Sequence, residues 1–287
     1  MKQEEIGNSV ERSGDFKASK FGIKNAADMV HIFSVLRSKL YSDKVLAVCR
    51  EYATNAFDAH IDAGIPDKPI RITLPNWADS YFKVRDFGKG LDEEGIREVY
   101  CMYGASTKRN SNAFNGQMGF GSKSAFAYTD FWQINSHCNG EMISYSVFLD
   151  ESGLGEVSEL ARTPTTETGV EIVIPVDKAD IPAFHRCASQ LYRWFRVTPE
   201  ILGADIAVNP PQISIDLGDV KITSSRMDDA IAVMGNVGYP VDINKFIHDR
   251  YASPDLKQDN KLNPKDSEWV RWRASNIVMY FDIGDLQ

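Results

Sequence analysis

Residues 44–63 constrain the fold more than any other segment, because their polar and apolar side chains separate with the period of an α-helix. At about 100° per residue, Glu51, Asn55 and Asp58 share a strip roughly 60° wide. The opposite side must pack on a core, and it carries Leu46, Cys49, Ala53, Phe57 and His60. The polar strip therefore faces a cleft or water, and an ordinary solvated helix face is the alternative to a binding site.

Alternating apolar and polar residues elsewhere predict a sheet that this helix can cover. Asn139-Gly140, between two such segments, is a hairpin turn signal. Residues 151–168 lack the alternation, and we expect an irregular excursion there. Further helices are expected at 25–40, 92–102, 122–128 and 182–195, and strands at 70–74, 82–85, 130–137, 141–149, 169–176, 213–215, 220–223, 231–233 and 277–281.

The length of 287 residues corresponds to about two domains. Short β-like runs between prolines characterise the last third of the chain, so a change of domain is expected there. We expect a flexible N-terminus at 1–18, a first domain at 19–180 and a second domain at 181–287. The final residues resemble a strand cut short, which indicates that the second domain is truncated at its C-terminal end.

Charge and composition exclude several classes of protein. The formal net charge is −8, from 32 Lys and Arg against 40 Asp and Glu, which disfavours a broad basic surface for nucleic acid. The four cysteines are isolated along the chain, which predicts reduced thiols instead of a metal site. No apolar run predicts a membrane-spanning helix, and no signal peptide is expected at the N-terminus. Peripheral attachment to a membrane stays open.

A second polar motif follows the strand expected at 82–85. Asp86 stands at the strand end, and Gly88 and Gly90 come two and four residues later. A carboxylate in this place can accept a hydrogen bond from an exocyclic amine. Glycines beside it let a ligand approach the backbone closely. A plain β-turn is the alternative for this motif alone.

A glycine-rich segment supplies the third motif. Gly116, Gly119 and Gly121 lead into an expected helix, so free backbone N–H groups and the helix dipole would face an anion. Ser122 and Lys123 add further donors. The Walker A pattern fails by one position, because serine stands where lysine is required, and the dinucleotide pattern also fails. A glycine-rich loop without a ligand is the alternative.

In this order, E-x-x-x-N-A-x-D-A, D-x-G-x-G and G-x-x-G-x-G resemble the motif set of the GHKL ATPases, which include the gyrase B subunit, the large heat-shock chaperones, MutL and the histidine kinases. The stretch GASTK at 104–108 is similar to the G-x-S-x-K lid of some members. Over roughly residues 20–180, the chain also resembles the rIIA-like proteins of T-even-type bacteriophages. The segments that carry this similarity are YSDKVLAVCREYATNAFDAH, VRDFGKGL, GFGSKSAFAYTDFWQI and TGVEIVIPV.

The resemblance implies an α+β fold, with a two-layer α/β sandwich of helices on a mixed, mainly antiparallel sheet, followed by a smaller transducer-like α/β domain. It implies ATP and Mg²⁺ as ligands. Glu51 then corresponds to the general base for attack by water, and Asn55 to the Mg²⁺ ligand. Asp58 would flank the nucleotide, and Asp86 would bind the adenine amino group.

The remaining candidate contacts follow from the same resemblance. Gly88 and Gly90 would admit the base, and the lid would close on the phosphates through Gly116, Gly119 and Gly121, with Lys108, Ser122 and Lys123 as phosphate contacts. The family places a threonine after its distal glycine, whereas here Thr168 precedes Gly169. Thr168 is therefore the candidate for the missing hydroxyl in the adenine site.

The function implied is an ATP-driven conformational switch with slow Mg²⁺-dependent hydrolysis, acting in lysis control or in protection against exclusion. A nucleotide-dependent homodimer is expected, with a second phage protein or a host membrane factor as further candidate partners. The expected location is the host cytoplasm, with peripheral attachment to the inner membrane as an alternative. Two other functions stay open: a non-hydrolysing nucleotide-binding scaffold at a membrane or replication complex, and a DNA-transaction ATPase subunit like gyrase B or MutL.

Overall fold

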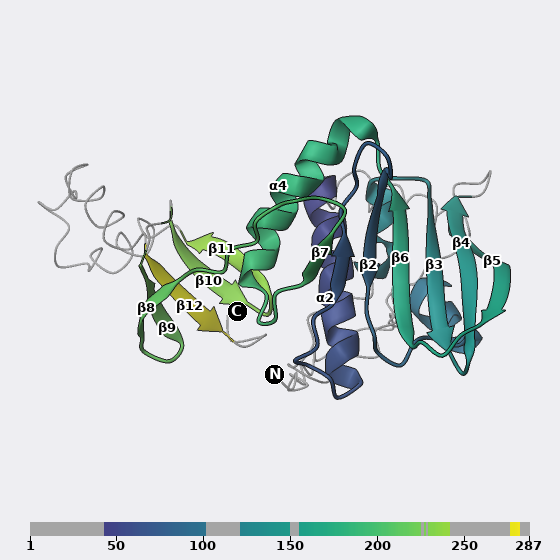
Figure 1. Ribbon diagram of the computed structural model, residues 1–287, viewed down its shortest axis with the longest axis horizontal. Coiled ribbons are helices and arrows are strands. Elements are labelled where there is room, and N and C mark those ends of the chain that lie inside the picture. The colour runs from purple at the N-terminus through teal and green to yellow at the C-terminus, as the bar shows by residue number, and fades with distance from the viewer. Residues whose placement is uncertain are drawn as a thin grey trace, which may run out of the picture.

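The computed structural model describes residues 43–101, 121–149, 155–224, 227, 229–241 and 276–281. The larger of its two sheets contains β1 (Arg71–Thr73), β2 (Tyr81–Arg85), β3 (Phe131–Cys138), β4 (Glu141–Leu149), β5 (Gly155–Pro164), β6 (Gly169–Pro175) and β7 (Glu200–Leu202). Their order is β5-β4-β3-β6-β2-β1-β7, and only β1 and β7 run parallel (Figure 1). Helices pack against this sheet, so the expected α+β class and its mainly antiparallel sheet are confirmed.

Helix α2 (Lys44–Asp62) is the central element of the helical layer. It begins at Asp43, whose side chain accepts a hydrogen bond from the Leu46 backbone N–H at 2.9 Å. It ends at Ala63, before Gly64 with a φ of 74°. The predicted helix at 44–63 is therefore confirmed. Leu46 is an error in the predicted packing face, because it lies near the N-cap and is 37% exposed.

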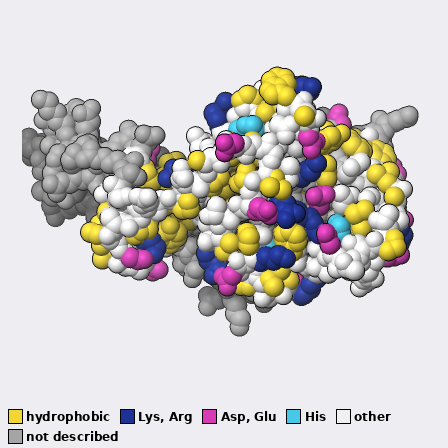
Figure 2. Space-filling view, in the orientation of Figure 1, with side chains coloured by type: hydrophobic (Ala, Val, Ile, Leu, Met, Phe, Trp, Pro, Cys, Tyr) yellow, Lys and Arg dark blue, Asp and Glu magenta, His cyan; other side chains and the backbone are white. Residues whose placement is uncertain are grey.

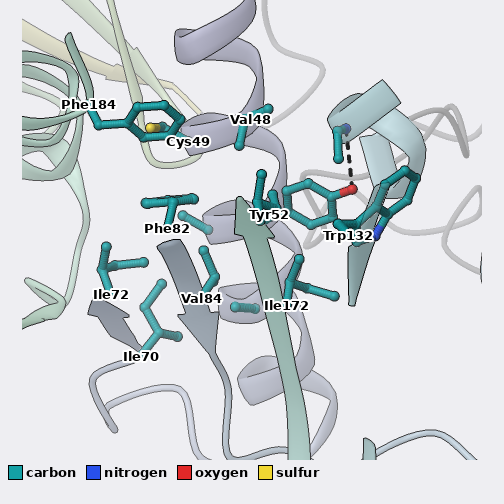
Figure 3. Close-up of a cluster of buried hydrophobic side chains, with 14 of the residues drawn as sticks. Val48, Cys49, Tyr52, Ile70, Ile72, Phe82, Val84, Trp132, Ile172 and Phe184 are labelled. Atoms are coloured by element: carbon teal, nitrogen blue, oxygen red, sulfur yellow. Dashed lines mark hydrogen bonds between the residues drawn. The ribbon is translucent and has the colours of Figure 1, made fainter. Parts of the chain in front are cut away.

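The core lies between α2 and the larger sheet. Figure 3 shows Val48 of α2 on the same side of the view as Phe82 and Val84, and the Tyr52 ring directed toward Trp132. All of these side chains are buried. At the other end of the layer, Trp132 packs edge-on against Phe126 with ring centroids 4.2 Å apart. Burial of one apolar face of α2 therefore fixes the direction of its other face.

Three short helical segments connect the strands beside α2. Asp92 caps α3 (Glu93–Ile96) by accepting a hydrogen bond from the Gly95 N–H, and α3 continues into the π-helical turn η1 (Arg97–Cys101). The segment expected as a helix at 122–128 is the 3₁₀ helix η2 (Gly121–Ala127). The helix expected at 92–102 is thus helical but irregular. Single π turns inside helices are frequent at functional sites.

The first unit extends past the boundary expected at residue 180. After η3 (Lys178–Asp180), helix α4 (Ile181–Leu191) and turn η4 (Tyr192–Trp194) pack on α2 and the common core. Strand β7 then pairs with β1 and completes the larger sheet. We expected these segments in the second domain, whereas their apolar residues, among them Phe184 and Leu191, are buried in the core that α2 shares.

The smaller sheet lies beyond this unit and contains β8 (Ile213–Asp216), β9 (Val220–Thr223), β10 (Ala230–Met234), β11 (Val237–Val241) and β12 (Ile277–Phe281). Its order is β11-β10-β12-β9-β8. The Arg196 N–H donates to Asn236 Oδ1 at 3.0 Å, and the Trp194 ring lies against Gly238, where a Cβ would be 2.7 Å from the ring. A smaller α/β region therefore follows the larger one, as expected.

Strand β5 overturns the expectation of an irregular excursion at 151–168. It is an edge strand that pairs only with β4, and nearly all of its side chains are exposed. An edge strand of this kind buries no face, so its sequence need not alternate. Strands β7 and β11 were also not expected. Within the described residues, no helix is long and apolar enough to cross a membrane.

Phe184→Ala should lower the free energy of unfolding by about 3–5 kcal/mol, because it removes a fully buried ring and leaves a cavity. The ring centroid of Phe184 lies 5.1 Å from that of Phe82 and 5.5 Å from that of Tyr128. Urea unfolding followed by circular dichroism measures the change. Leu46→Ala is the control, since the same method should find a loss below about 1 kcal/mol at this half-exposed position. Equal losses for the two variants would contradict the assigned core.

Candidate functional site

The polar strip of α2 lies where the helical period places it, but its three members differ in exposure. Glu51 and Asn55 are partly exposed, whereas Asp58 is completely buried. The expectation that the whole strip faces a cleft or water is therefore wrong for Asp58. Glu51 Oε1 accepts from the neighbouring Arg50 Nη2 at 2.7 Å, which orients the carboxylate.

Asp86 directly follows β2, as predicted, and its carboxylate is held by backbone N–H groups. Gly88 N donates to Oδ1 at 2.8 Å, and Val170 N donates to Oδ2 at 3.1 Å. The Asp86 N–H donates to the Val170 carbonyl at 2.9 Å, so the strand end is also tied to β6. A carboxylate has about four acceptor positions. Two of these positions are taken by the backbone donors, which orient the carboxylate.

The two glycines after Asp86 lie against other elements of the fold. A Cβ at Gly88 would be 2.9 Å from the Ala59 carbonyl oxygen of α2. Gly90 has a φ of +75°, and a Cβ there would clash with the His137 carbonyl of β3. Both positions thus require glycine for packing within the chain. Their proposed role in admitting a base stays a prediction.

Gly169 brings the start of β6 against Asp86. Its φ is +103°, and a Cβ there would clash with the Asp86 carbonyl and lie 2.7 Å from Oδ1 of the same residue. Thr168 is exposed, and its carbonyl accepts from the buried Arg85 Nη2 at 2.8 Å. Arg85 also donates to the Asp86 carbonyl and to Glu167. Whether the Thr168 hydroxyl contacts adenine stays a prediction.

Helix η2 joins the end of the glycine-rich segment to Glu51. A Cβ on Gly121 would lie 2.6 Å from Glu51 Oε2, so this glycine lets the backbone approach the carboxylate. The buried Ser122 hydroxyl and Lys123 ammonium donate to the Val99 carbonyl of η1 at 3.0 and 2.8 Å. Lys108, Gly116 and Gly119 lie outside the described residues, and their proposed contacts with phosphate remain expectations.

Tyr52 fixes η2 to α2 next to Glu51. Its hydroxyl donates to the Ser122 carbonyl at 2.9 Å and accepts from the Ala125 N–H at 3.3 Å. The ring is buried, as Figure 3 shows from its place between α2 and η2. A tyrosine on the buried side of a helix needs a partner for its hydroxyl. Here that partner is the backbone that follows the glycine-rich segment.

His60 ties the other half of α2 to the Asp86 motif. Its Nε2 is 2.8 Å from the Phe87 backbone N, and its Nδ1 is 2.9 Å from the Lys68 carbonyl oxygen. Burial lowers the pKa of His60 below the usual 6.5, and the positive charges of Lys68 and Arg85 act in the same direction. The ring is therefore neutral near pH 7.

Tyr100 of η1 is a further residue near Asp86. Burial raises the pKa of the Tyr100 hydroxyl, and the negative charge of Asp86 raises it further. Neither Tyr100 nor Arg85 was singled out in the sequence. His60 was placed on the packing side of α2, and its polarity there was the available signal, because a buried imidazole requires hydrogen-bond partners.

The described parts of the three motifs, with Gly121 alone of the third set of glycines, therefore meet along α2. Glu51 and Tyr52 contact the start of η2, and Ala59 and His60 contact the loop that carries Asp86. Eight residues separate Glu51 from Ala59, which corresponds to about 12 Å along the helix axis. Two carboxylates, Glu51 on α2 and Asp86 on a loop packed against α2, are thus held at separate points along one helix.

The residues present also fit a divalent cation that arrives with a phosphate ligand. Asn55 is partly exposed and lies one turn from Glu51, and its amide oxygen is a hard ligand of the kind that Mg²⁺ prefers. Among the described residues there is no cluster of three or more His, Cys, Asp or Glu that could hold a metal. Mg²⁺ commonly takes only one or two protein ligands together with substrate phosphates and water.

Basic and acidic side chains form ion pairs on the surface at the sheet side of this region. Figure 2 shows basic and acidic side chains interleaved on the face that it presents. Arg71 pairs with Glu200 at 2.8 Å, and Arg85 with Glu167 at 3.2 Å. Each of these arginines thus lies beside a carboxylate that offsets its positive charge.

Comparison with known proteins finds a family model that is similar to part of the chain. Residues 43–178 match the family model described as histidine kinase-, DNA gyrase B-, and HSP90-like ATPase. The match begins at the N-cap of α2 and ends in η3, so it spans the Glu51 strip, Asp86 and η2. No significant match was found among the curated proteins.

Gly169→Ala should destabilise the fold by more than about 2 kcal/mol, because the new Cβ must displace Asp86. Gly140→Ala is the matched control. Gly140 also has a positive φ, of 84°, but a Cβ there meets nothing within 4 Å. Thermal unfolding of both variants separates the cost of the backbone conformation from the cost of the clash. A Gly169→Ala variant no less stable than Gly140→Ala would contradict the close approach to Asp86.

Proposed function

We propose that this chain binds ATP with Mg²⁺ and hydrolyses it slowly as a conformational switch. The match of residues 43–178 to a family model of GHKL-type ATPases supports this proposal. One observation carries the proposal: the loop after Asp86 packs on Ala59 and His60 of α2, the helix that also carries Glu51, and the Gly88 amide holds the Asp86 carboxylate. The family domain supports ATP binding in general. The residue roles below are part of the proposal.

Asp86 is the group that recognises the base. Its two oxygens already accept from Gly88 N and Val170 N, so they are oriented before a ligand binds. The 6-amino group of adenine is a donor and can complete the acceptor capacity of the carboxylate. An oriented acceptor of this kind loses little entropy on binding, which favours adenine over bases that present an acceptor at the same position.

Glu51 is the general base. It takes a proton from the attacking water as the oxygen of that water bonds to the γ-phosphorus and the bond to the bridging oxygen of ADP breaks, which yields ADP and phosphate. Asn55 would hold Mg²⁺ beside it, and the cation supplies charge neutralisation for the phosphates. Gly121 of η2 lies next to Glu51, so closure of the glycine-rich segment, with Lys123 as a phosphate contact, would complete the phosphate end.

The biological role we propose is that of an rIIA-like phage protein in lysis control or protection against exclusion, acting in the host cytoplasm or at the inner membrane. The similarity of the segments around Glu51, Asp86 and Gly169 to that family supports this proposal. Nucleotide-dependent pairing of two copies, with a second phage protein or a host membrane factor as partner, belongs to the same proposal.

A non-hydrolysing nucleotide-binding scaffold is the second candidate, and one contact favours it. Glu51 Oε1 is engaged by Arg50 at 2.7 Å, and an engaged carboxylate is a poorer acceptor for a proton from water. ATP would then order the chain without being hydrolysed. Steady-state phosphate release from the wild-type chain decides between the two functions.

Asp86→Asn should weaken Mg²⁺-ATP binding by about 10- to 100-fold, since it replaces a charged acceptor with a neutral amide. Calorimetry with ATP and Mg²⁺ measures the change. Asp62→Asn is the control, because Asp62 is an exposed carboxylate on the last turn of α2, paired only at the surface with Lys89. Wild-type affinity in the Asp86 variant would remove the adenine-binding role.

Glu51→Ala should keep ATP affinity within a few-fold of wild type but lower phosphate release by about 100-fold or more, as loss of a general base does. Asn55→Ala should instead lose Mg²⁺-dependent binding. Calorimetry and phosphate release on the same preparations separate the two effects. Hydrolysis at the parent rate by Glu51→Ala would show that another group is the base.

A further inference from the structure

We propose that His60 is a positioning residue that holds the Asp86 motif on α2 and thereby sets the preference of the site for adenine over guanine. The inference rests on the proposed function, because it assumes that Asp86 reads a base. It adds a residue that the three motifs do not contain. His60 lies two positions beyond Asp58, on the side of α2 that packs inward.

Both nitrogens of the His60 ring are engaged, and their partners fix the tautomer. The Lys68 carbonyl only accepts, so Nδ1 carries the proton and donates across 2.9 Å. The Phe87 N–H only donates, so Nε2 is unprotonated and accepts across 2.8 Å. The ring is fully buried, and a buried ring with two backbone partners has one orientation. His60 is therefore a fixed acceptor aimed at the backbone next to Asp86.

The Phe87 N–H that donates to His60 belongs to the residue directly after Asp86. Gly88 N, the next amide along the chain, donates to Asp86 Oδ1 at 2.8 Å. Two successive amides are thus held, the first by His60 on α2 and the second by Asp86 itself. Gly88 lies against the Ala59 carbonyl, where a Cβ would be 2.9 Å away, so the loop has no room to move toward the helix. Loss of the His60 acceptor would free the loop in the opposite direction.

Position of the carboxylate matters for base selection because adenine and guanine differ at the 6-position. Adenine presents an amino donor there, and guanine presents a carbonyl acceptor. A carboxylate fixed opposite this position accepts from adenine and repels the guanine oxygen. A carboxylate that can shift avoids the repulsion and loses the directed hydrogen bond. Release of the loop should therefore reduce the affinity for ATP more than that for GTP.

Two substitutions of similar size and polarity separate this role from general stability. His60→Gln can retain an amide oxygen near the Nε2 position and so keep an acceptor for Phe87. His60→Asn reaches only the region of Nδ1 and loses that acceptor. Asp62→Asn is the control on the same helix. Asp62 also contacts the loop, by accepting from Lys89 at 2.9 Å, but both side chains are more than half exposed, so this contact should hold the loop only weakly.

The experiment measures the dissociation constants of Mg²⁺-ATP and Mg²⁺-GTP for the full chain and each variant. The ratio of the GTP dissociation constant to the ATP dissociation constant should be the same in the wild type and in Asp62→Asn. His60→Asn should lower that ratio by about 10-fold, the size of one directed hydrogen bond, and His60→Gln should restore most of it. At saturating ATP, phosphate release by His60→Asn should stay within about 3-fold of wild type, because Glu51 is untouched.

A wild-type ratio in His60→Asn would overturn the inference, as would equal binding of ATP and GTP by the wild-type chain. If the wild type binds no ATP, the proposed function itself fails, which is a different result. Should His60→Asn not fold, hydrogen exchange of the Phe87 amide in the wild type decides. ATP should slow this exchange by about 10-fold more than GTP does at equal saturation, and equal slowing would overturn the inference.

Discussion

Burial of one face of α2 against the sheet is the constraint on which the rest of the structure depends. Val48, Tyr52 and Phe57 pack inward, and this packing fixes where Glu51 and Asn55 lie. The same buried face carries polar atoms that cannot be left without partners. Tyr52 and His60 find theirs on η2 and on the loop after Asp86. Packing of the helix and assembly of the site are therefore one event.

Much of this arrangement could be predicted from the sequence, because it follows from local periodicity. The bounds of α2 and the position of Asp86 at a strand end depend on residues within one or two turns or strands of each other. The full burial of Asp58 and the contact of Gly121 with Glu51 could not be predicted, since they depend on elements far apart in sequence. Strand β5 was missed because an exposed edge strand needs no apolar pattern.

Three glycines of the motifs are required by packing within the chain, apart from any contact that they make with a ligand. Gly88, Gly90 and Gly169 each lie where a side chain would strike α2, β3 or Asp86, so each permits close packing of the chain on itself. Such packing leaves the Asp86 carboxylate oriented by two backbone amides. Pre-orientation of a binding group is a source of affinity, because the entropy loss occurs during folding instead of binding.

The pairing of β7 with β1 has a consequence for synthesis of the chain. Arg71 lies opposite Glu200, so the two partners are separated by most of the first unit. A ribosome must deliver residues up to Leu202 before the sheet can close, and until then β1 keeps an open edge. Late closure of this kind favours slow folding and exposes an edge to neighbouring chains. During translation, the first unit is therefore most exposed to association with neighbouring chains until residues 200–202 have been added.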